Sequence, residues 1–501
     1  MKKTFLFSHE TPFTFSRLFI FMQAYIEQQF FQWQGFLPTH IETLPQAGSS
    51  RLYFRITWGE NQTCVATYNP NYLAENEAFI YFSEKFQQLH LPVPQVFFLA
   101  EKKDLYFQSD EGNEALYNVL TREGHSEKVY QLYQKVLEQL ANLQIKGHAQ
   151  IDYNHCLAAK SFDRSAILYD LNYFLFYFVN VLEINYNKTQ LFEEFSQLAD
   201  FLSQAPAQYF MFRDFQSRNI MVKENEVKFI DYQGGMRGAL QYDVVSLLWQ
   251  AKAALPLAWK KSLLDFYFEK ANLLVEGGLE KSSFYQNYQG YILIRILQTF
   301  GSYGFRGLFE RRPYFLSAIP AALQQLKDFL EKEGLPIQLP VLGKILNEII
   351  NEKNVKRFQT ISANAESKLV VKIKSFSYKK GIPADTTSNG GGFVFDCRSL
   401  HNPGRYEPYK TQTGRDEPVK QFLLTQSEMS NFLKNIYPLL DIAVQNYLER
   451  DFDSLMICFG CTGGQHRSVF AADSVASYLK DKYCVKIELE HRERGWEVET
   501  R

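Results

Sequence analysis

The sequence predicts a two-lobed α+β domain followed by a separate, smaller α/β domain, and two observations carry this prediction. The first is the stretch 210–234, which has the pattern of a loop followed by a tight β-hairpin, with strand patterns upstream and helical spacing on both sides. The second is the apolar run 454–459, which leads through a glycine-rich loop into a helix, as a buried parallel strand does. The 501 residues suffice for roughly two to four domains with substantial cores.

Composition narrows the function classes before any motif is considered. The formal net charge of −1 gives no overall basic character, so a nucleic-acid site would have to be a local patch. The six cysteines form no secreted disulfide framework, which favours a reducing, cytoplasmic compartment. No run approaches the eighteen or so apolar residues of a membrane span. Residues 1–21 are interpreted either as an N-terminal extension or as the result of a wrongly assigned start codon.

Residues 22–120 are predicted to form the first lobe. It begins with a helix at 22–34 and continues with a strand, a glycine loop and a second strand at 44–56. The loop offers backbone N–H groups, hydroxyls and one guanidinium to a phosphate, from Gly48, Ser49, Ser50 and Arg51. The third strand, 64–67, carries no lysine, so Arg51 or Arg55 is expected to supply the positive charge. Glu77 is a candidate carboxylate at the start of the next helix, or simply a solvated one.

The hairpin brings three oxygen-bearing side chains together. Alternating apolar residues define its two arms, and Glu224-Asn225 form the turn. This geometry places Asn219 and Asp231 side by side at the open end, with Asp214 on the loop that leads in. Such a cluster suits a hard cation such as Mg²⁺ and a hydroxyl that must lose a proton.

These motifs carry a family resemblance. Arg213-Asp214 with Asn219 resembles the catalytic loop of protein-kinase-like enzymes, and Ile230-Asp231-Tyr232 their metal-binding strand end. The variant resembles the aminoglycoside phosphotransferase superfamily, and within it the AmgK-type kinases that phosphorylate N-acetylmuramate or N-acetylglucosamine at the anomeric hydroxyl. That subgroup also tends to lack the strand lysine. The resemblance implies a bilobal protein-kinase-like fold, ATP as co-substrate, Asp214 as catalytic residue, and Asn219 and Asp231 as ligands of Mg²⁺.

Residues 121–355 are predicted to form a helical second lobe that carries the acceptor site. Asp163 and Arg164 are candidates to bind sugar hydroxyls, with a helix cap as the alternative for Asp163. Arg295 and Arg306 are candidates for the carboxylate of a muramic acid, with ordinary surface charges as the alternative. A helix, a glycine-interrupted corner and another helix are expected across 288–315. Residues 356–368 are polar and aperiodic and are interpreted as a linker.

Residues 369–501 are predicted to form the α/β domain. Strands are expected at 370–378 and 393–398, and helices at 418–424, 427–437 and 440–450. The run 454–459 then feeds a glycine loop and a helix N-terminus, which is an anion-binding arrangement. The candidate anion site comprises Cys461, Thr462, Gly463, Gly464, His466, Arg467 and Ser468, with Asp396 and Arg398 from the neighbouring strand end.

Two interpretations of this loop compete. The spacing of Cys461, Arg467 and Ser468 is that of cysteine phosphatases, in which a thiolate attacks phosphorus. Five sequence blocks between residues 375 and 494 instead resemble the C-terminal domain of RapZ, an RNase adapter, which implies binding of an amino-sugar phosphate such as glucosamine 6-phosphate. The lysines, arginines and tyrosines of residues 369–410 could contact RNA or form a solvated face.

The sequence as a whole is interpreted as an ATP-dependent amino-sugar kinase of cell-wall sugar recycling, joined to a phosphosugar-sensing domain. ATP, the amino sugar and an amino-sugar phosphate are the expected partners, and no membrane is expected. Two alternatives stay open at this stage. One is a non-catalytic adapter that binds amino-sugar phosphate or RNA, and the other is a kinase for a different hydroxyl acceptor, because acceptor pockets are built from scattered side chains.

Overall fold

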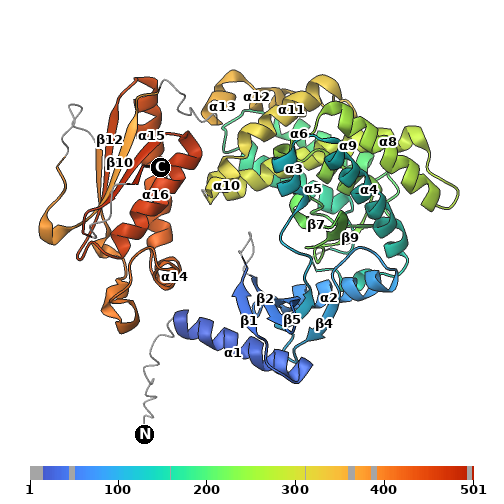
Figure 1. Ribbon diagram of the computed structural model, residues 1–501. Coiled ribbons are helices and arrows are strands. Elements are labelled where there is room, and N and C mark those ends of the chain that lie inside the picture. The colour runs from blue at the N-terminus through green and yellow to red at the C-terminus, as the bar shows by residue number, and fades with distance from the viewer. Residues whose placement is uncertain are drawn as a thin grey trace, which may run out of the picture. The chain divides into compact units, whose positions relative to one another are not determined.

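The computed structural model describes residues 15–44, 51–157, 159–310, 312–358, 367–384, 392–493 and 499–500. Contacts divide the chain into two compact units. Tyr25–Phe358 form one, and Gln359–Arg501 belong to the other, with which the residues before Tyr25 are grouped. Figure 1 colours the first unit from blue to yellow and the second from orange to red. Within the described residues, no helix combines the length and the apolar character that crossing a bilayer requires.

The first lobe is built on an antiparallel sheet with the strand order β1-β2-β3-β5-β4. Its residues alternate between two covered faces. Phe107 of β5 points to helix α1, where it packs on Phe30 at a ring-centroid distance of 6.0 Å, and Tyr106 points to helix α2, where it stacks on Phe79 at 5.3 Å. The elements are α1 (Phe15–Gln34), β1 (His40–Thr43), β2 (Leu52–Trp58), β3 (Gln62–Tyr68), α2 (Leu73–Gln88), β4 (Val96–Leu99) and β5 (Leu105–Ser109).

The second lobe is helical, and two small β-elements lie between it and the sheet (Figure 1). These are the hairpin of β7 (Ile220–Lys223) and β8 (Glu226–Phe229), and the pair of β6 (Tyr209–Met211) and β9 (Met236–Gly238). The α-helices are α3 (Leu116–Glu123), α4 (Glu127–His148), α5 (Arg164–Phe174), α6 (Lys188–Leu202), α7 (Leu240–Leu248), α8 (Leu257–Leu274), α9 (Lys281–Tyr303), α10 (Pro313–Leu316), α11 (Ile319–Lys332), α12 (Pro340–Ile349) and α13 (Glu352–Phe358). Short 3₁₀ turns are η1 (Tyr153–His155), η3 (Ser217–Asn219) and η4 (Ala251–Ala253).

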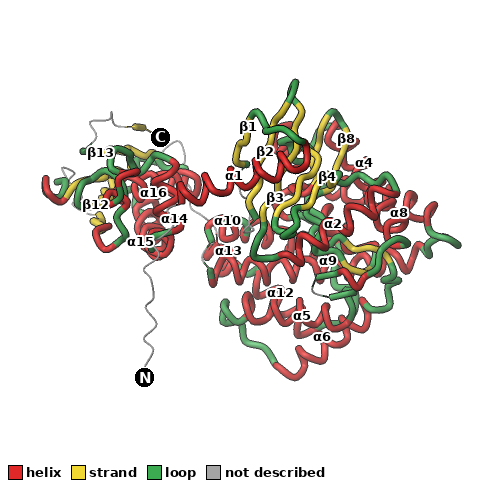
Figure 2. The backbone as a smooth tube through the Cα atoms, turned by 90° about the horizontal axis from the view of Figure 1, so that it is seen from below, coloured by secondary structure: helices red, strands yellow, loops and turns green. Residues whose placement is uncertain are grey.

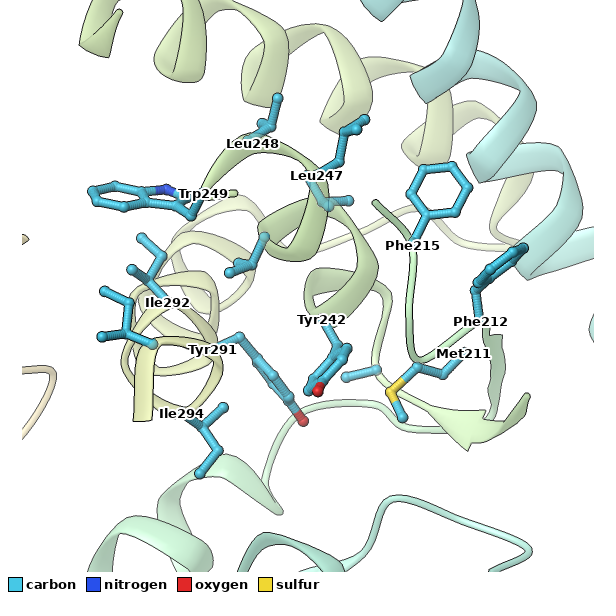
Figure 3. Packing of buried hydrophobic residues seen from close by; sticks show 14 of the residues in the cluster. Met211, Phe212, Phe215, Tyr242, Leu247, Leu248, Trp249, Tyr291, Ile292 and Ile294 are labelled. Carbon is cyan, nitrogen blue, oxygen red and sulfur yellow. The ribbon is translucent and has the colours of Figure 1, made fainter. Parts of the chain in front are cut away.

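The core of the second lobe lies beneath loop 212–219 (Figure 3). Met211 and Phe212 enter it from the loop, and Tyr242 comes from α7, while α9 contributes Tyr291 and Ile292. These side chains are fully buried, apart from a trace of exposure at Tyr291. Burial of this kind contributes roughly 1.5–3 kcal/mol for each large side chain, so the loop rests on a stiff base.

The second unit is an α/β domain. Its sheet has the order β11-β12-β10-β13-β14, with the first four strands parallel and β14 antiparallel. Helix α16 contacts β10, β12 and β13, and α15 packs on α16, so the helices cover one face of the sheet (Figure 2). The elements are β10 (Val370–Ser377), β11 (Gly392–Asp396), α14 (Glu417–Thr425), α15 (Met429–Glu449), β12 (Ser454–Cys461), α16 (Arg467–Tyr483), β13 (Lys486–His491) and β14 (Glu499–Thr500), with 3₁₀ turns η6 (Tyr378–Lys380), η7 (Cys397–Ser399), η8 (Pro403–Arg405) and η9 (Glu407–Tyr409).

The fold class predicted from the sequence is therefore confirmed, and two helix predictions are corrected. The helices expected at 427–437 and 440–450 are one helix, because Leu433, Ile436 and Leu440 keep a continuous buried stripe across Pro438. The corner expected within 288–315 is absent at Gly301, where α9 runs on and then passes into a π-helical segment, η5 (Gly304–Phe309). A second π-helical segment, η2 (Leu175–Val179), follows α5.

Candidate functional site

The predicted hairpin is confirmed in register as well as in position. Ile220 pairs with Phe229 and Val222 with Val227, and the turn residues Glu224 and Asn225 both have positive φ, as a tight hairpin turn requires. The pairing continues beyond the strands, because the N–H of Ile230 donates to the carbonyl of Asn219 at 3.0 Å. The open end of the hairpin therefore joins the end of loop 212–219 to the start of segment 230–233.

Asp214 lies on this loop and is half-exposed. Its backbone carbonyl accepts a hydrogen bond from Nδ2 of Asn219 at 2.9 Å, which fixes the loop against the hairpin. Its carboxylate faces two guanidinium groups, that of Arg218 at 3.2 Å and that of Arg295 at 3.6 Å. A carboxylate held on a rigid loop with one side open to solvent can receive a proton from a bound hydroxyl.

Asp231 and Asn219 present oxygen atoms at the same place. Asp231 adopts a φ of 71°, and its Oδ1 accepts hydrogen bonds from Gln233 and Arg51 at 2.8 and 3.2 Å. Burial raises the pKa of Asp231. The negative charge of the Asp214 carboxylate acts in the same direction, as expected for two carboxylates that repel each other. Asn219 uses its amide nitrogen on Asp214 and keeps its side-chain oxygen as an acceptor. A carboxylate and an amide oxygen beside a second carboxylate fit the hard-oxygen preference of Mg²⁺.

The guanidinium of Arg51 lies between a carboxylate of α2 and Asp231. Arg51 is only 6% exposed, and its guanidinium forms an ion pair with Glu75 of α2 at 2.6 Å while it reaches Asp231 at 3.2 Å. The partner is Glu75 rather than Glu77, whose carboxylate pairs with the exposed Lys103. Gly48, Ser49 and Ser50 lie outside the described residues.

Arg55, the other sequence candidate for that charge, is engaged elsewhere. Its Nε donates to Asp110 at 2.6 Å, and its NH2 group donates to Asn113 at 2.7 Å. Burial raises the pKa of Asp110, but the hydrogen bonds from Arg55 outweigh it and hold that pKa below its ordinary value. Arg55 therefore ties β2 to the segment after β5 and contacts neither Asp231 nor Glu75 in the described contacts.

A buried carboxylate braces the loop from below. Asp243 of α7 accepts the N–H groups of Phe212 and Arg213 at 2.7 and 3.0 Å, and Nε2 of Gln144 at 3.1 Å. Arg213 has a φ of 77°, which is strained for a side chain of this size. Its guanidinium binds both oxygens of Asp170 on α5, at 2.9 and 3.0 Å. The loop conformation that presents Asp214 is thus held by two buried acids.

The four acceptor-binding candidates are placed differently. Arg295 is buried, donates to Ser246 at 2.9 Å and approaches Asp214, so the structure brings it to the site. Arg306 is exposed on η5, where its guanidinium lies 5.3 Å from the ring of Phe315. Asp163 caps α5 by accepting the N–H groups of residues 165 and 166, and Arg164 pairs with Asp200 of α6 at 2.6 Å. These last two side chains are committed to the helix cap and to a surface ion pair.

In the second unit, the glycine loop of residues 461–468 surrounds the thiol of Cys461. Sγ of Cys461 lies 3.1 Å from the hydroxyl of Ser468 and accepts the N–H of Gly464 at 3.2 Å. The carbonyl of Thr462 accepts the hydroxyl of Ser377 at 2.7 Å, and no atom of the described chain would crowd a Cβ at Gly463. The loop is therefore a compact turn over a buried cysteine at the N-terminus of α16.

The two basic residues of this loop point into the protein. Arg467 donates from NH1 to the carbonyls of residues 398 and 400, at 3.0 and 2.8 Å, and is 3% exposed. His466 contacts the carbonyl of Tyr409 at 2.8 Å. Phosphatase chemistry needs this arginine on the phosphate, whereas here its NH1 group is held by two backbone carbonyls. Asp396 and Arg398 pair with each other at 2.6 Å, which lowers the pKa of Asp396, and Arg398 covers the ring of Tyr378.

One network in this unit was not identified from the sequence. Arg415 donates to Asp473 at 3.0 Å and approaches Nε2 of His491 at 3.0 Å, while Nδ1 of His491 meets the hydroxyl of Ser375 at 2.8 Å. Burial opposes ionisation of Asp473, yet hydrogen bonds from His491 and Arg415 lower its pKa to about 2. The network links α16, β10 and β13 below the loop. No spacing rule joins residues so far apart in the chain.

Comparison with known proteins assigns the two parts separately. Residues 40–277 match the family model described as the phosphotransferase enzyme family, and residues 369–495 match that of the RapZ C-terminal domain. A relative named nucleotide-binding protein, from Endomicrobium trichonymphae, is 33% identical over 173 residues, which is 32% of this chain and 58% of the relative. A relative of the same name from Ruminiclostridium cellulolyticum is 39% identical over 125 residues, which is 25% of this chain and 41% of that relative. The chain thus spans about half the length of these curated relatives.

Two solved structures are similar to the chain over the larger part of its length. The choline kinase LicA from Streptococcus pneumoniae has 11% identity and a TM-score of 0.42, covering 62% of this chain and 99% of that one. A choline kinase from Cryptosporidium parvum Iowa II has 12% identity and a TM-score of 0.46, and the similarity covers 64% of this chain and 98% of that one.

Proposed function

We propose that the first unit is an ATP-dependent kinase that phosphorylates an amino sugar, N-acetylmuramate or N-acetylglucosamine, at its anomeric hydroxyl. The observation that carries the proposal is the convergence of Asp214, Asn219 and Asp231 at the open end of one hairpin, with Arg51 bridging Glu75 and Asp231. A general phosphotransferase activity follows from the family of residues 40–277. The choice of an amino sugar rests on the AmgK-type sequence motifs.

Phosphoryl transfer needs a general base for the acceptor hydroxyl, positive charge beside the phosphates and exclusion of water. Asp214 accepts the proton of the acceptor hydroxyl as that oxygen forms its bond to the γ-phosphorus and the bond to the ADP oxygen breaks. Asn219 and Asp231 would hold Mg²⁺, which neutralises phosphate charge when bound. Arg51 donates to the phosphates from the sheet side, and Glu75 orients its guanidinium. Arg295 sits beside Asp214 and orients its carboxylate toward the acceptor.

We infer that the second unit binds an amino-sugar phosphate at the loop of residues 461–468. The support is the loop's position between a parallel strand and a helix N-terminus, where backbone N–H groups and the helix dipole favour an anion. The inward commitment of Arg467 and the burial of Cys461 support binding rather than phosphate hydrolysis. RNA binding by the exposed lysines of residues 369–410 is a less supported alternative, because Lys380 and Lys410 are paired with Glu493 and Glu407.

The test is ATP consumption by the purified protein with N-acetylmuramate and with N-acetylglucosamine. Sugar-dependent turnover is expected, and Asp214→Asn should lower kcat by at least about a hundredfold, since general-base catalysis contributes on this scale. Asp163→Asn is a matched control, because that carboxylate caps a helix and should leave kcat within a fewfold. Equal turnover in wild type and Asp214→Asn would contradict the assignment of the base. Absence of sugar-dependent turnover would contradict the acceptor.

A further inference from the structure

An exposed row of aromatic side chains lies where the two π-helical segments meet. We define the aromatic shelf as Tyr169, Tyr173, Tyr177, Phe305 and Phe309. Neighbouring rings contact one another at centroid distances of 6.1 Å for Tyr169–Tyr173, 4.7 Å for Tyr173–Tyr177, 4.9 Å for Tyr177–Phe305 and 5.7 Å for Phe305–Phe309. The two end members, Tyr169 and Phe309, are each 67% exposed. The shelf is thus a continuous row of packed aromatic rings whose two end members face the solvent.

Local backbone structure marks the same place. The two π-helical segments found among the described residues, η2 and η5, are packed against each other, and a Cβ at Gly304 would stand 2.1 Å from the carbonyl oxygen of Tyr177. π-Helical turns are uncommon and occur frequently at functional sites. Here each one follows directly on the end of a helix, η2 after α5 and η5 after α9, next to shelf residues of that helix.

The shelf is connected to the candidate active site along α9, and on α5 it begins beside a residue that braces the site. Tyr169 directly precedes Asp170, whose carboxylate holds Arg213 next to Asp214. On α9, Arg295 approaches Asp214, and Gln298, Thr299 and Ser302 follow on the same face. Ser302 lies roughly 10 Å along the helix axis from Arg295, given a rise of 1.5 Å per residue. A path of amide and hydroxyl groups therefore leads from the catalytic aspartate to the shelf.

Charged groups lie at the far end of this path. Arg306 belongs to η5 and Glu310 caps its C-terminal end, so the two charged residues flank the shelf residues Phe305 and Phe309 in the same segment. Aromatic faces for the C–H side of a pyranose ring, flanked by a few hydrogen-bonding side chains, form the kind of surface that holds an extended sugar.

We propose that the aromatic shelf is a second acceptor subsite that stacks on the next sugar ring of a reducing-end oligosaccharide whose anomeric hydroxyl is at Asp214. This inference rests on the proposed kinase function and deepens it. The acceptor is then a disaccharide or longer glycan of N-acetylated amino sugars rather than a free monosaccharide. Its reducing end takes the phosphoryl group by the step described above, and its remaining rings lie along α9 toward Arg306.

The experiment compares kcat/KM for N,N′-diacetylchitobiose and N-acetylglucosamine. The wild type is expected to prefer the disaccharide about tenfold in kcat/KM, because only the disaccharide has a second ring to stack on the shelf, and tenfold corresponds to about 1.4 kcal/mol. In the double variant Tyr169→Ala/Phe309→Ala the preference should fall to about one. Phe192→Ala, a 44% exposed aromatic of α6 outside the shelf, should keep the wild-type preference. An equal preference in wild type and double variant would overturn the subsite.

Calorimetric titration with the disaccharide separates the subsite from the kinase assignment. Binding to the wild type that is lost in the double variant, without turnover of either sugar, would reject the kinase and support the subsite. Turnover without any shelf-dependent binding or preference would do the reverse. A change in sedimentation coefficient in the double variant, with an unchanged sugar preference, would assign the shelf to a protein interface and overturn the proposal.

Discussion

At the scale of single residues, Arg51 is the most informative side chain of the candidate site. In protein kinases, a strand lysine pairs with a helix glutamate and holds the nucleotide phosphates. Here the third strand has no lysine, and Arg51, directly before the second strand, pairs with Glu75 of the following helix and reaches Asp231. The planar guanidinium can serve two acids and a phosphate oxygen at once, which an ammonium group cannot do in a fixed geometry.

This arrangement predicts that Arg51→Met raises the KM for ATP and lowers kcat/KM by about ten- to a hundredfold. The reason is that charge-assisted hydrogen bonds contribute roughly 1.5–3 kcal/mol. Arg51→Lys should recover only part of the loss, because one ammonium cannot keep both Glu75 and Asp231. Steady-state kinetics with varied ATP at saturating sugar provide the measurement.

Arg55→Lys is the matched control for this prediction. Arg55 lies on the same strand, but its contacts are to Asp110, Asn113 and Glu42. Its replacement should change the KM for ATP by no more than about twofold, in line with the small net contribution of partly exposed ion pairs. A larger effect of Arg55→Lys than of Arg51→Met would mean that the sequence alternative, Arg55 as the phosphate ligand, was right.

The residues of the site fall into two groups. The positions of some follow from the sequence around them, and the positions of the others depend on how distant elements pack. Asp214, Asn219 and Asp231 were predicted to converge because a hairpin joins them within a few residues, and a hairpin has a sequence pattern of its own. Glu75 and the contact of Arg295 with Asp214 depend on how α2 and α9 pack, which no spacing rule reports. The inward direction of Arg467 is of the same kind, since its carbonyl partners belong to a different loop.

At the scale of elements, the loop that carries Asp214 depends on α7. Asp243 lies in the first turn of that helix and is fully buried, and it receives three N–H groups from the loop and from α4. Burial raises the pKa of Asp243 to about 7, and the hydrogen bonds only partly offset this. These contacts make Asp243 a structural brace of the loop.

A pH dependence of stability follows. The unfolded pKa of an aspartate is about 3.9, so between pH 4 and pH 7 the folded protein keeps a proton that the unfolded chain has lost. The free energy of unfolding should therefore fall as pH rises through this window and level off above it. Urea unfolding at pH 5 and pH 7.5, followed by tryptophan fluorescence, measures the change. Four of the five tryptophans belong to the first unit: Trp33, Trp58, Trp249 and Trp259.

Asp243→Asn isolates this contribution, because the variant lacks the titrating group and should lose less stability between the two pH values than the wild type. Identical pH dependence in both proteins would contradict the raised pKa. If the Asn variant fails to fold, Gln144→Leu gives a second test. It deletes one donor to the carboxylate, moves the pKa further up and should extend the fall in stability above pH 7.

The helices show where sequence patterns stop being informative. Periodic apolar positions located most of them, but Pro438 and the glycines near residue 301 were weighted as helix breakers. Burial overrides both: α15 keeps its stripe across Pro438, and Gly301 lets α9 approach the backbone of Phe174, which is 3.1 Å from where a Cβ would be. The π-helical segments have no sequence signature at all, because they result from the packing of two helices on each other.

At the scale of the whole molecule, the chain joins a part that matches the phosphotransferase enzyme family to a part that matches the RapZ C-terminal domain. Each unit has its own buried core, so neither needs the other to bury its apolar residues. We propose that the second unit senses an amino-sugar phosphate and adjusts the kinase by feedback. The motivation is that both proposed ligands belong to one chemical class and that a single chain holds their sites at a fixed ratio.

Feedback predicts that glucosamine 6-phosphate changes kcat/KM for the amino sugar by about 5- to 150-fold, the usual range of allosteric coupling between two sites. Linkage requires the reverse effect as well, so the amino sugar must change the affinity for glucosamine 6-phosphate by the same factor when both are measured by binding. The chain lacking residues 369–501 should show basal kinetics that glucosamine 6-phosphate does not alter. Glucose 6-phosphate, which lacks the amino group, is the matched ligand control.

Competition at the kinase site is the alternative source of such an effect, and the loop of residues 461–468 separates the two. Gly463→Asp should repel a phosphate electrostatically at a position where no described atom crowds a Cβ, so folding is expected to be preserved. In this variant the response to glucosamine 6-phosphate should disappear while basal turnover stays unchanged. A response that persists in Gly463→Asp and in the truncated chain would place the phosphosugar at Asp214 and reject regulation by the second unit.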